Sequence, residues 1–193
     1  MFSYLPLLTV LLLTGATADP AAAPEVTVTE ARGIYSVKAR FEIAQTASIA
    51  LAVLSDYEQI PRFMPDVRKS VVRERGPKRL LVEQEAVSQF MMFSKRVHLL
   101  LEVVEDGNAI RFSDQSGKSF SSYHGSWVAD ATAGGATITY ELTAKPGFEV
   151  PEFILKRLLK RDSGAMIGRL RQEFALRATK QPAGNATLEP YRR

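Results

Sequence analysis

Six strand-like segments follow one another between residues 67 and 144, and this run constrains the fold more than any other feature of the sequence. The segments alternate apolar and polar residues, and turn-forming residues such as Gly76-Pro77 and Gly134-Gly135 separate them. They cover residues 67–75, 79–89, 95–104, 109–114, 123–131 and 137–144. Short connections favour antiparallel hairpins, so the run predicts an antiparallel sheet. Alternation at Tyr35, Val37, Ala39, Phe41 and Ile43 predicts one earlier strand, which makes seven.

A long amphipathic helix is predicted after the strands, over residues 152–177. Pro151 precedes it, at a position where the start of a helix tolerates proline. Apolar residues fall within about a third of its circumference, namely Leu155, Leu159, Met166, Leu170 and Phe174. The opposite face carries Arg157, Lys160, Arg161 and Arg171. The apolar stripe needs a large apolar partner, so we expect an α+β fold in which a curved sheet surrounds this helix.

Two short helices are predicted between the first strand and the run of six. Thr46 is placed to cap a helix rich in alanine and leucine over residues 47–54. The decapeptide DYEQIPRFMP follows, in which Asp56 can cap a second short helix and the two prolines restrict its extent. This arrangement delivers Phe63 and Met64 onto the rest of the fold, either as the lining of a cavity or as a plug of the core.

The N-terminal residues predict export. A run of nine mostly apolar residues, 5–13, precedes Ala16-Thr17-Ala18, which is the small-x-small pattern of a signal-peptide cleavage site. Such a run is too short to span a bilayer, which needs roughly 20 residues. We expect cleavage after Ala18 and a periplasmic or secreted protein. Its mature chain would comprise a flexible leader over 19–32, one domain over 33–178 and a disordered tail over 179–193.

The composition argues against several kinds of function. The absence of cysteine excludes disulfides, thiol nucleophiles and thiolate metal sites. The formal charge of +4 comes without a dense basic block, so we expect no nucleic-acid partner. His98 and His124 lie on separate predicted strands, and no phosphate or dinucleotide motif is present. We therefore expect no metal and no cofactor.

Three stretches resemble the START-like helix-grip superfamily (SRPBCC), and within it the polyketide cyclase/dehydrase group that includes coenzyme-Q-binding START domains. They read ASIALAVLSDYEQIPRFMPDVRKSVV (47–72), GKSFSSYHGSW (117–127) and YELTAKPGFEVPEFILKRLLK (140–160). In the second stretch, Gly117, Phe120, Gly125 and Trp127 match a glycine-aromatic-glycine-tryptophan pattern. The resemblance implies a helix-grip fold, in which seven strands curve around the C-terminal helix, and a cavity between the helix and the sheet.

Methionine and aromatic residues are more numerous than the core of a small sheet requires, and we expect many of them to line that cavity. The candidate ligand-binding residues are Phe63, Met64, Phe90, Met92, Phe93, Tyr123, Trp127, Tyr140, Phe153, Leu159 and Met166. Asp162 falls within the apolar stripe of the helix, where it could orient a polar head group or act as an acid or base. Alternatively, it could pair with Arg169 or a strand hydroxyl, or lie at the edge of the stripe.

These observations predict a protein that binds or transports a hydrophobic small molecule, such as a lipid or a quinone. One alternative is a cyclase or dehydratase that uses the same cavity, with Asp162 as the weak catalytic candidate. Another is a protein-interaction module that binds through the basic helix. The basic face, with Arg157, Lys160, Arg161 and Arg171, could also dock on an anionic membrane.

Overall fold

The computed structural model describes residues 24–90, 93–149 and 151–180. The predicted signal peptide lies outside these residues, as does the predicted tail from residue 181 onward. Thr179 and Lys180, which we expected in that tail, form the last residues of a helix instead. Within the described residues, no helix combines the length and the apolar character that crossing a membrane requires.

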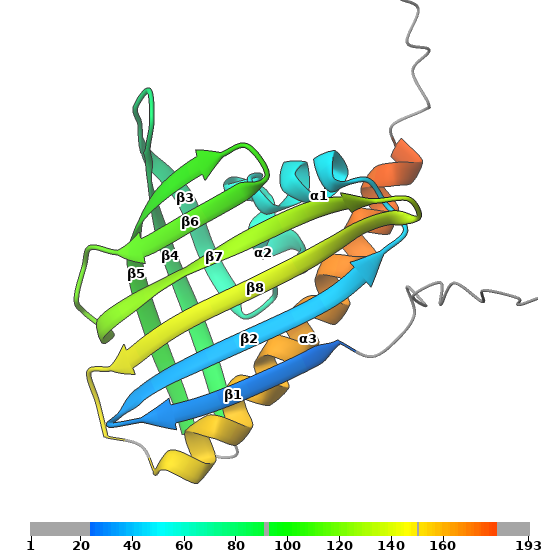
Figure 1. The fold of residues 1–193 in the computed structure, drawn as a ribbon. Coiled ribbons are helices and arrows are strands. Elements are labelled where there is room, and N and C mark those ends of the chain that lie inside the picture. Colours follow the sequence, from blue (N-terminus) through cyan, green and yellow to red (C-terminus); the bar gives the residue numbers. More distant parts are fainter. Residues whose placement is uncertain (1–23, 91–92, 150, 181–193) are drawn as a thin grey trace, which may run out of the picture.

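One antiparallel sheet of eight strands makes up most of the fold, in the order β1-β2-β8-β7-β6-β5-β4-β3. The strands are β1 (Glu25–Ala31), β2 (Ile34–Ile43), β3 (Val67–Arg75), β4 (Leu80–Phe90), β5 (Phe93–Asp106), β6 (Ala109–Asp114), β7 (Phe120–Thr132) and β8 (Gly135–Pro146). The sheet curves strongly, so that β3, β4 and β5 cross behind the plane of β8, β2 and β1 (Figure 1). The curvature creates a concave face that can surround a helix.

The first strand corrects the sequence prediction. Residues 25–31 were expected in a flexible leader, but they form β1, which pairs with β2 from Glu25↔Arg40 to Ala31↔Ile34. Arg32 and Gly33 make the hairpin turn, with φ angles of 56° and 76°, and glycine adopts such left-handed angles without steric cost. Val26 and Val28 pack against the core. The sheet therefore has eight strands and not seven.

Three short helical segments follow β2 where two short helices were predicted: α1 (Ala47–Leu54), one 3-10 turn (Tyr57–Gln59) and α2 (Ile60–Phe63). The Ile49 amide donates to Thr46 Oγ1 at 3.4 Å, which confirms the expected cap of α1. Asp56 stands at the cap position of the 3-10 turn but makes no side-chain cap hydrogen bond. It accepts from Arg177 at 2.7 Å instead, and so attaches the C-terminal helix to this segment.

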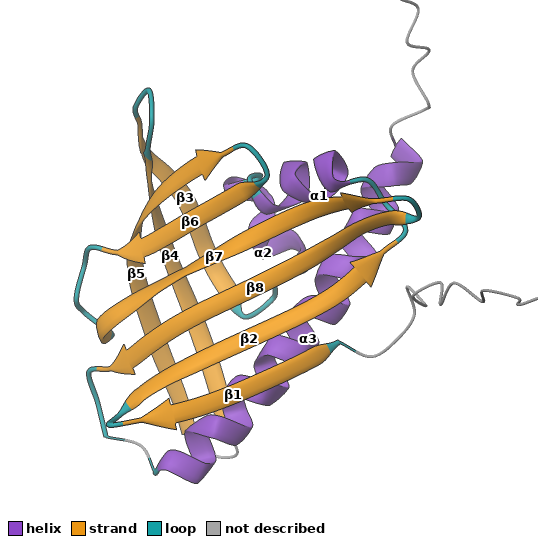
Figure 2. Cartoon of the chain, viewed as in Figure 1, coloured by secondary structure: helices purple, strands orange, loops and turns teal. Residues whose placement is uncertain are grey.

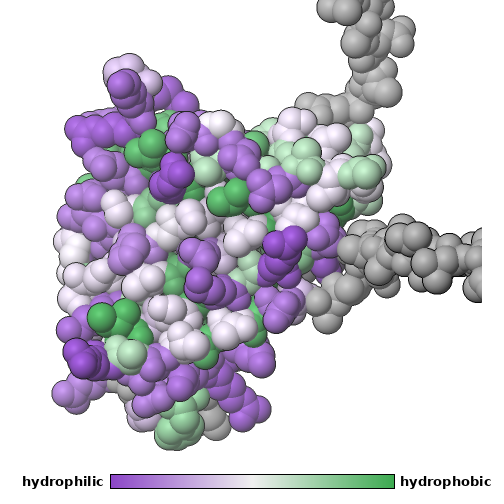
Figure 3. Space-filling model, viewed as in Figure 1, coloured by the Kyte–Doolittle hydropathy of each residue, from purple (hydrophilic) through white to green (hydrophobic). Residues whose placement is uncertain are grey.

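The long helix α3 (Glu152–Lys180) runs along the concave face of the sheet behind β1 and β2 (Figure 2). Its buried side chains are Leu155, Ser163, Ile167, Leu170 and Phe174. Ile167 and Phe174 are fully buried, whereas Leu159 and Met166 are only partly buried. The outer face of the sheet carries mainly polar side chains with isolated apolar ones between them (Figure 3). The core therefore lies between α3 and the concave face.

Candidate ligand-binding cavity

A cavity of about 620 Å³ lies between α3 and the concave face of the sheet. Side chains of α1, α2, α3 and strands β3 to β8 line it, and most of them are apolar or aromatic. Pockets that bind small organic molecules have similar volumes and a similarly apolar lining. The side chains of the curved sheet and of the single helix thus do not fill the space between them.

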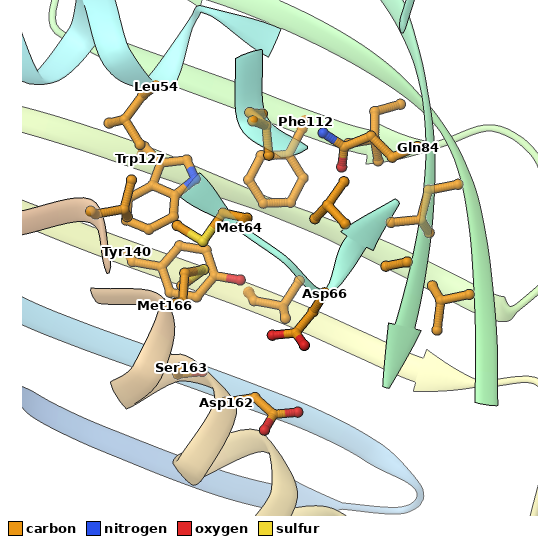
Figure 4. Close-up of a pocket in the computed structure, with 18 of the residues that line it drawn as sticks. Leu54, Met64, Asp66, Gln84, Phe112, Trp127, Tyr140, Asp162, Ser163 and Met166 are labelled. Carbon is orange, nitrogen blue, oxygen red and sulfur yellow. The ribbon is translucent and has the colours of Figure 1, made fainter. Parts of the chain in front are cut away.

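Stacked aromatic rings form one wall of the cavity. Trp127 on β7 and Tyr140 on β8 are direct partners in the sheet, and their ring centroids lie 4.2 Å apart at an interplanar angle of 28°. Tyr123 contacts Phe120 and Phe112, with centroid distances of 4.9 and 6.0 Å. Such contacts stabilise the pairs beyond the area that they bury, so this wall is a rigid surface. Figure 4 shows Trp127, Tyr140 and Phe112 around the same space.

Gly125 shapes this wall. Tyr123, Gly125 and Trp127 alternate along β7 and therefore face the same side of the sheet. A Cβ atom at Gly125 would lie 2.7 Å from Cζ of Phe112 and would also overlap the Glu141 carbonyl oxygen. The missing side chain lets the Phe112 ring lie over β7 and lets β8 approach closely.

The hydroxyl groups of Tyr123 and Tyr140 are two polar groups in the otherwise aromatic wall of the cavity. Burial raises the pKa of Tyr123 to about 12, and the negative charge of Asp114 acts in the same direction, while the hydrogen bond with Tyr140 opposes them. Burial also raises the pKa of Tyr140 well above its ordinary value, assisted by the neighbouring Tyr123. Both phenols therefore keep their protons at neutral pH.

A third polar group lies on the strand opposite. Gln84 on β4 lines the cavity, and its Nε2 donates to Oγ of the buried Ser70 at 3.1 Å. Tyr57 also lines the cavity, but its hydroxyl donates to Glu105 at 2.7 Å. Burial, followed by this hydrogen bond, raises the pKa of Tyr57 strongly. Its hydroxyl is thus already engaged within the protein.

The charged residues among those lining the cavity form two ion pairs, and we call these four residues the mouth. Arg169 Nη1 lies 2.8 Å from Asp66, and Arg161 Nη2 lies 2.8 Å from Asp162. Asp66 and Asp162 retain 63% and 44% of their side-chain exposure, so the charges face solvent at the edge of the cavity. Arg169 was one of the partners considered for Asp162, but Arg169 pairs with Asp66, and Asp162 pairs with Arg161.

Seven of the predicted ligand-binding residues line the cavity together: Phe63, Met64, Tyr123, Trp127, Tyr140, Leu159 and Met166. Their role in binding stays a prediction. Phe153 does not join them, because it lies at the start of α3 with 74% of its surface exposed. Met92 lies outside the described residues, as do the side chains of Phe90 and Phe93.

The sequence analysis missed several lining residues, among them Phe112, Phe120 and Gln84. Phe120 belongs to the glycine-aromatic-glycine-tryptophan pattern of residues 117–127, so the sequence does carry a signal for it. Phe112 faces the cavity only because β6 pairs with β7 opposite Gly125, a register that the sequence does not reveal. Gln84 looked like an ordinary polar residue on a strand that alternates inward and outward.

The basic face of α3 is smaller than the sequence predicted. Arg157, Lys160 and Arg161 are exposed, although Arg161 pairs with Asp162. Arg171 turns toward the sheet instead, where its guanidinium carbon lies 5.3 Å from the ring centre of Phe41 and Nη2 donates to the Glu42 carbonyl. Arg171 therefore contributes to packing and does not extend the outer basic surface.

His98 lies outside the cavity, on the outer face of the sheet beside Glu83 and Glu85. The ligand atoms of these three residues lie within 4.8 Å of one another, a grouping that can hold a metal ion. However, Lys69 Nζ lies 3.0 Å from Glu83 and 3.3 Å from Glu85, and Arg73 also pairs with Glu83. These cations lower the pKa of Glu83 to about 2, with Lys69 the larger cause. The carboxylates are thus neutralised by the protein itself.

The concave sheet around one long helix, with a cavity between them, is the architecture of the helix-grip proteins. The chain matches the family described as polyketide cyclase/dehydrase and lipid transport over residues 35–175, and it belongs to this family. No curated protein matches its sequence at a significant level.

Solved structures of START-superfamily proteins share the fold. The STAR-related lipid transfer protein of Xanthomonas axonopodis has a TM-score of 0.61 and 16% identity, over 80% of this chain and 99% of that one. The Zhui aromatase/cyclase of Streptomyces sp. R1128 has 0.66 and 14%, over 78% and 98%. Human STARD10 has 0.63 and 13%, over 83% and 77%. Identities this low establish the fold and not the ligand.

Proposed function

We propose that this protein binds and carries a hydrophobic small molecule in the cavity between α3 and the sheet. The observation that carries the proposal is the cavity of about 620 Å³ whose lining is mostly apolar and aromatic. A ligand that hides about 300 Å² of apolar surface there gains roughly 7 kcal/mol, part of which is lost on association. Affinity would therefore follow the apolar area, and the few polar groups would set the orientation.

The proposal is tested by native mass spectrometry of the mature protein purified from its own host, followed by extraction and identification of the bound molecule. A stoichiometric hydrophobic compound is expected. Ala86→Phe would fill the cavity from β4, since Ala86 lines it, and should remove the compound. Ala175→Phe, at an exposed position of α3, is the matched control and should retain it. Retention of the compound by both variants would contradict binding in this cavity.

A cyclase or dehydratase activity is the second candidate, and the structural similarity to the Zhui aromatase/cyclase favours it. Among the described residues that line the cavity there is no histidine, and the two carboxylates, Asp66 and Asp162, are both paired at the mouth. This arrangement favours binding over proton transfer. Asp162→Asn distinguishes the two functions, since a carrier keeps its affinity and an enzyme that depends on Asp162 loses turnover.

We further propose that the protein is exported and that cleavage follows Ala18. The support is the apolar run before Ala16-Thr17-Ala18. N-terminal sequencing of the protein isolated from the periplasm or the medium should begin at Asp19, and a mature form that begins at Met1 would refute export by this route.

Contact with an anionic membrane surface is proposed for the outer face of α3. Phe153 is 74% exposed at the start of this helix, and Arg157 and Lys160 follow it at helical spacing. Sedimentation with phosphatidylglycerol vesicles should fall in the double variant R157E/K160E and should persist with the outer variant Gln172→Glu as a control. Equal sedimentation of the double variant and the wild type would exclude this surface.

A further inference from the structure

The middle of α3 forms one wall of the cavity. The lining residues of this helix extend from Leu159 to Leu170 and include two residues of the mouth on either side of Ser163, namely Asp162 and Arg169. Figure 4 shows Asp162 and Ser163 on this part of the helix, beside the space. The position of α3 relative to the sheet therefore sets the width of the mouth.

The half of α3 that follows Gly168 is held in place by burial and by ion pairs. Leu170 and Phe174 are 2% and 0% exposed. Arg169 and Arg177 lie 2.8 and 2.7 Å from aspartate oxygens of the segment between α1 and β3. Movement of this half would expose core side chains and break both ion pairs.

The half of α3 that precedes Ser163 is packed less tightly. Leu155 is its one buried side chain, although the structure describes all of residues 152–162. Phe153, Arg157 and Lys160 are exposed. In Figure 1, the first turns of α3 (yellow) extend beyond β1, the strand at the edge of the sheet. This half can leave the sheet with a smaller loss of buried apolar area.

Two glycines and a serine lie where the two halves meet. Ser163 and Gly164 are neighbours, and Gly168 follows one turn later. Helices bend at Gly/Ser pairs, and glycine is the poorest helix former after proline. No described atom lies within 4 Å of a Cβ built at Gly164 or Gly168, and neither glycine has a positive φ. Neither close packing nor a special backbone angle thus requires glycine at these positions.

We propose that α3 contains a hinge at residues 163–168, about which residues 152–162 move away from the sheet while the following residues stay in place. The movement widens the mouth between α3 and the connection from α2 to β3, and so controls how fast a ligand enters and leaves. This inference rests on the proposed function and adds the route of ligand exchange. The glycines make bending easiest at the point where the tightly packed half begins.

Spin-label distances test the hinge without a ligand. The chain has no cysteine, so introduced cysteines are the only attachment sites. Double electron–electron resonance on K38C/R157C measures the distance from β2 to the moving half, and K38C/A175C is the control on the other half. The first distance distribution should be broad and should become narrow in the G164A/G168A background. The control distribution should be narrow in both backgrounds.

Stopped-flow fluorescence with N-phenyl-1-naphthylamine, a neutral hydrophobic probe, tests the consequence for exchange. In G164A/G168A, the association and dissociation rates should both fall about tenfold while Kd stays unchanged, because the hinge affects the opening and not the closed complex. Ala175→Gly is the matched control, since it places a glycine at an exposed position of the half that is held. It should leave both rates unchanged.

Narrow distributions for both label pairs in the wild type would overturn the hinge, as would equal exchange rates in the wild type and G164A/G168A. Either result would leave a hydrophobic carrier intact. Failure of N-phenyl-1-naphthylamine to bind the wild type would count against the proposed function instead, and the label distances would then decide the hinge alone.

Discussion

Replacing Gly125 by alanine should destabilise the protein strongly, because the added methyl group has no room. The new Cβ would lie 2.7 Å from Cζ of Phe112, and it would also overlap the carbonyl oxygen of Glu141 on β8. The ring can move only into the cavity, but the carbonyl belongs to the β7–β8 ladder and cannot move without breaking pairing. Overpacking of this kind costs about 1–3 kcal/mol, and the backbone overlap places Gly125→Ala at the upper end.

Thermal unfolding followed by circular dichroism measures this change. For a domain of this size, a loss of about 3 kcal/mol lowers Tm by roughly 6–12 °C. Trp127 is the only tryptophan of the chain and lies two residues from Gly125 on β7, so its fluorescence should report the same shift locally.

Gly164→Ala on α3 is the control. Nothing lies within 4 Å of a Cβ at Gly164, and alanine in a helix is favoured over glycine by about 1 kcal/mol, so this variant should be more stable than the wild type. If Gly125→Ala unfolds at or above the wild-type temperature, the argument that β8 and Phe112 close over a bare backbone is refuted.

Two further predictions concern α3 and the outer face of the sheet. Ile167→Ala should lower the free energy of unfolding by about 2–5 kcal/mol, because Ile167 is fully buried. Leu159→Ala only enlarges the cavity, so it should cost less stability but should weaken ligand binding. Chemical denaturation measures the stability and calorimetry the binding, and equal stability losses in the two variants would contradict the assignment of Ile167 to the core and Leu159 to the cavity. Lys69 and Arg73 hold the pKa of Glu83 at about 2, below its ordinary 4.5. The contribution of Glu83 to stability is therefore present above pH 4.5 and disappears as the pH falls toward 2. Glu83→Gln should flatten the dependence of Tm on pH between these values, and an unchanged slope would refute the role of this ion pair.

Local patterns in the sequence were sufficient for the elements themselves. Alternation predicted the strands from Ile34 onward, and the cap at Thr46 predicted where α1 begins. These signals are carried by residues that are neighbours in the chain, so no tertiary information was needed. The first strand was missed because it has only Val26 and Val28 as inward residues beside a Pro- and Ala-rich segment, and its pairing with β2 gives it most of its stability.

The cavity and its polar groups depended on contacts between distant residues. Ile167 and Met166 belong to the same apolar side of α3, yet one fills the core and the other faces an open space, and only the curvature of the sheet decides which. The pairing of Arg169 with Asp66 and the packing of Arg171 on Phe41 likewise follow from where α3 crosses the sheet. Hydrophobic periodicity predicts which side chains are shielded from water. It does not predict whether other protein atoms or a bound ligand shield them. The sequence by itself thus determined the elements and their apolar faces, and the tertiary structure determined that a cavity remains between them.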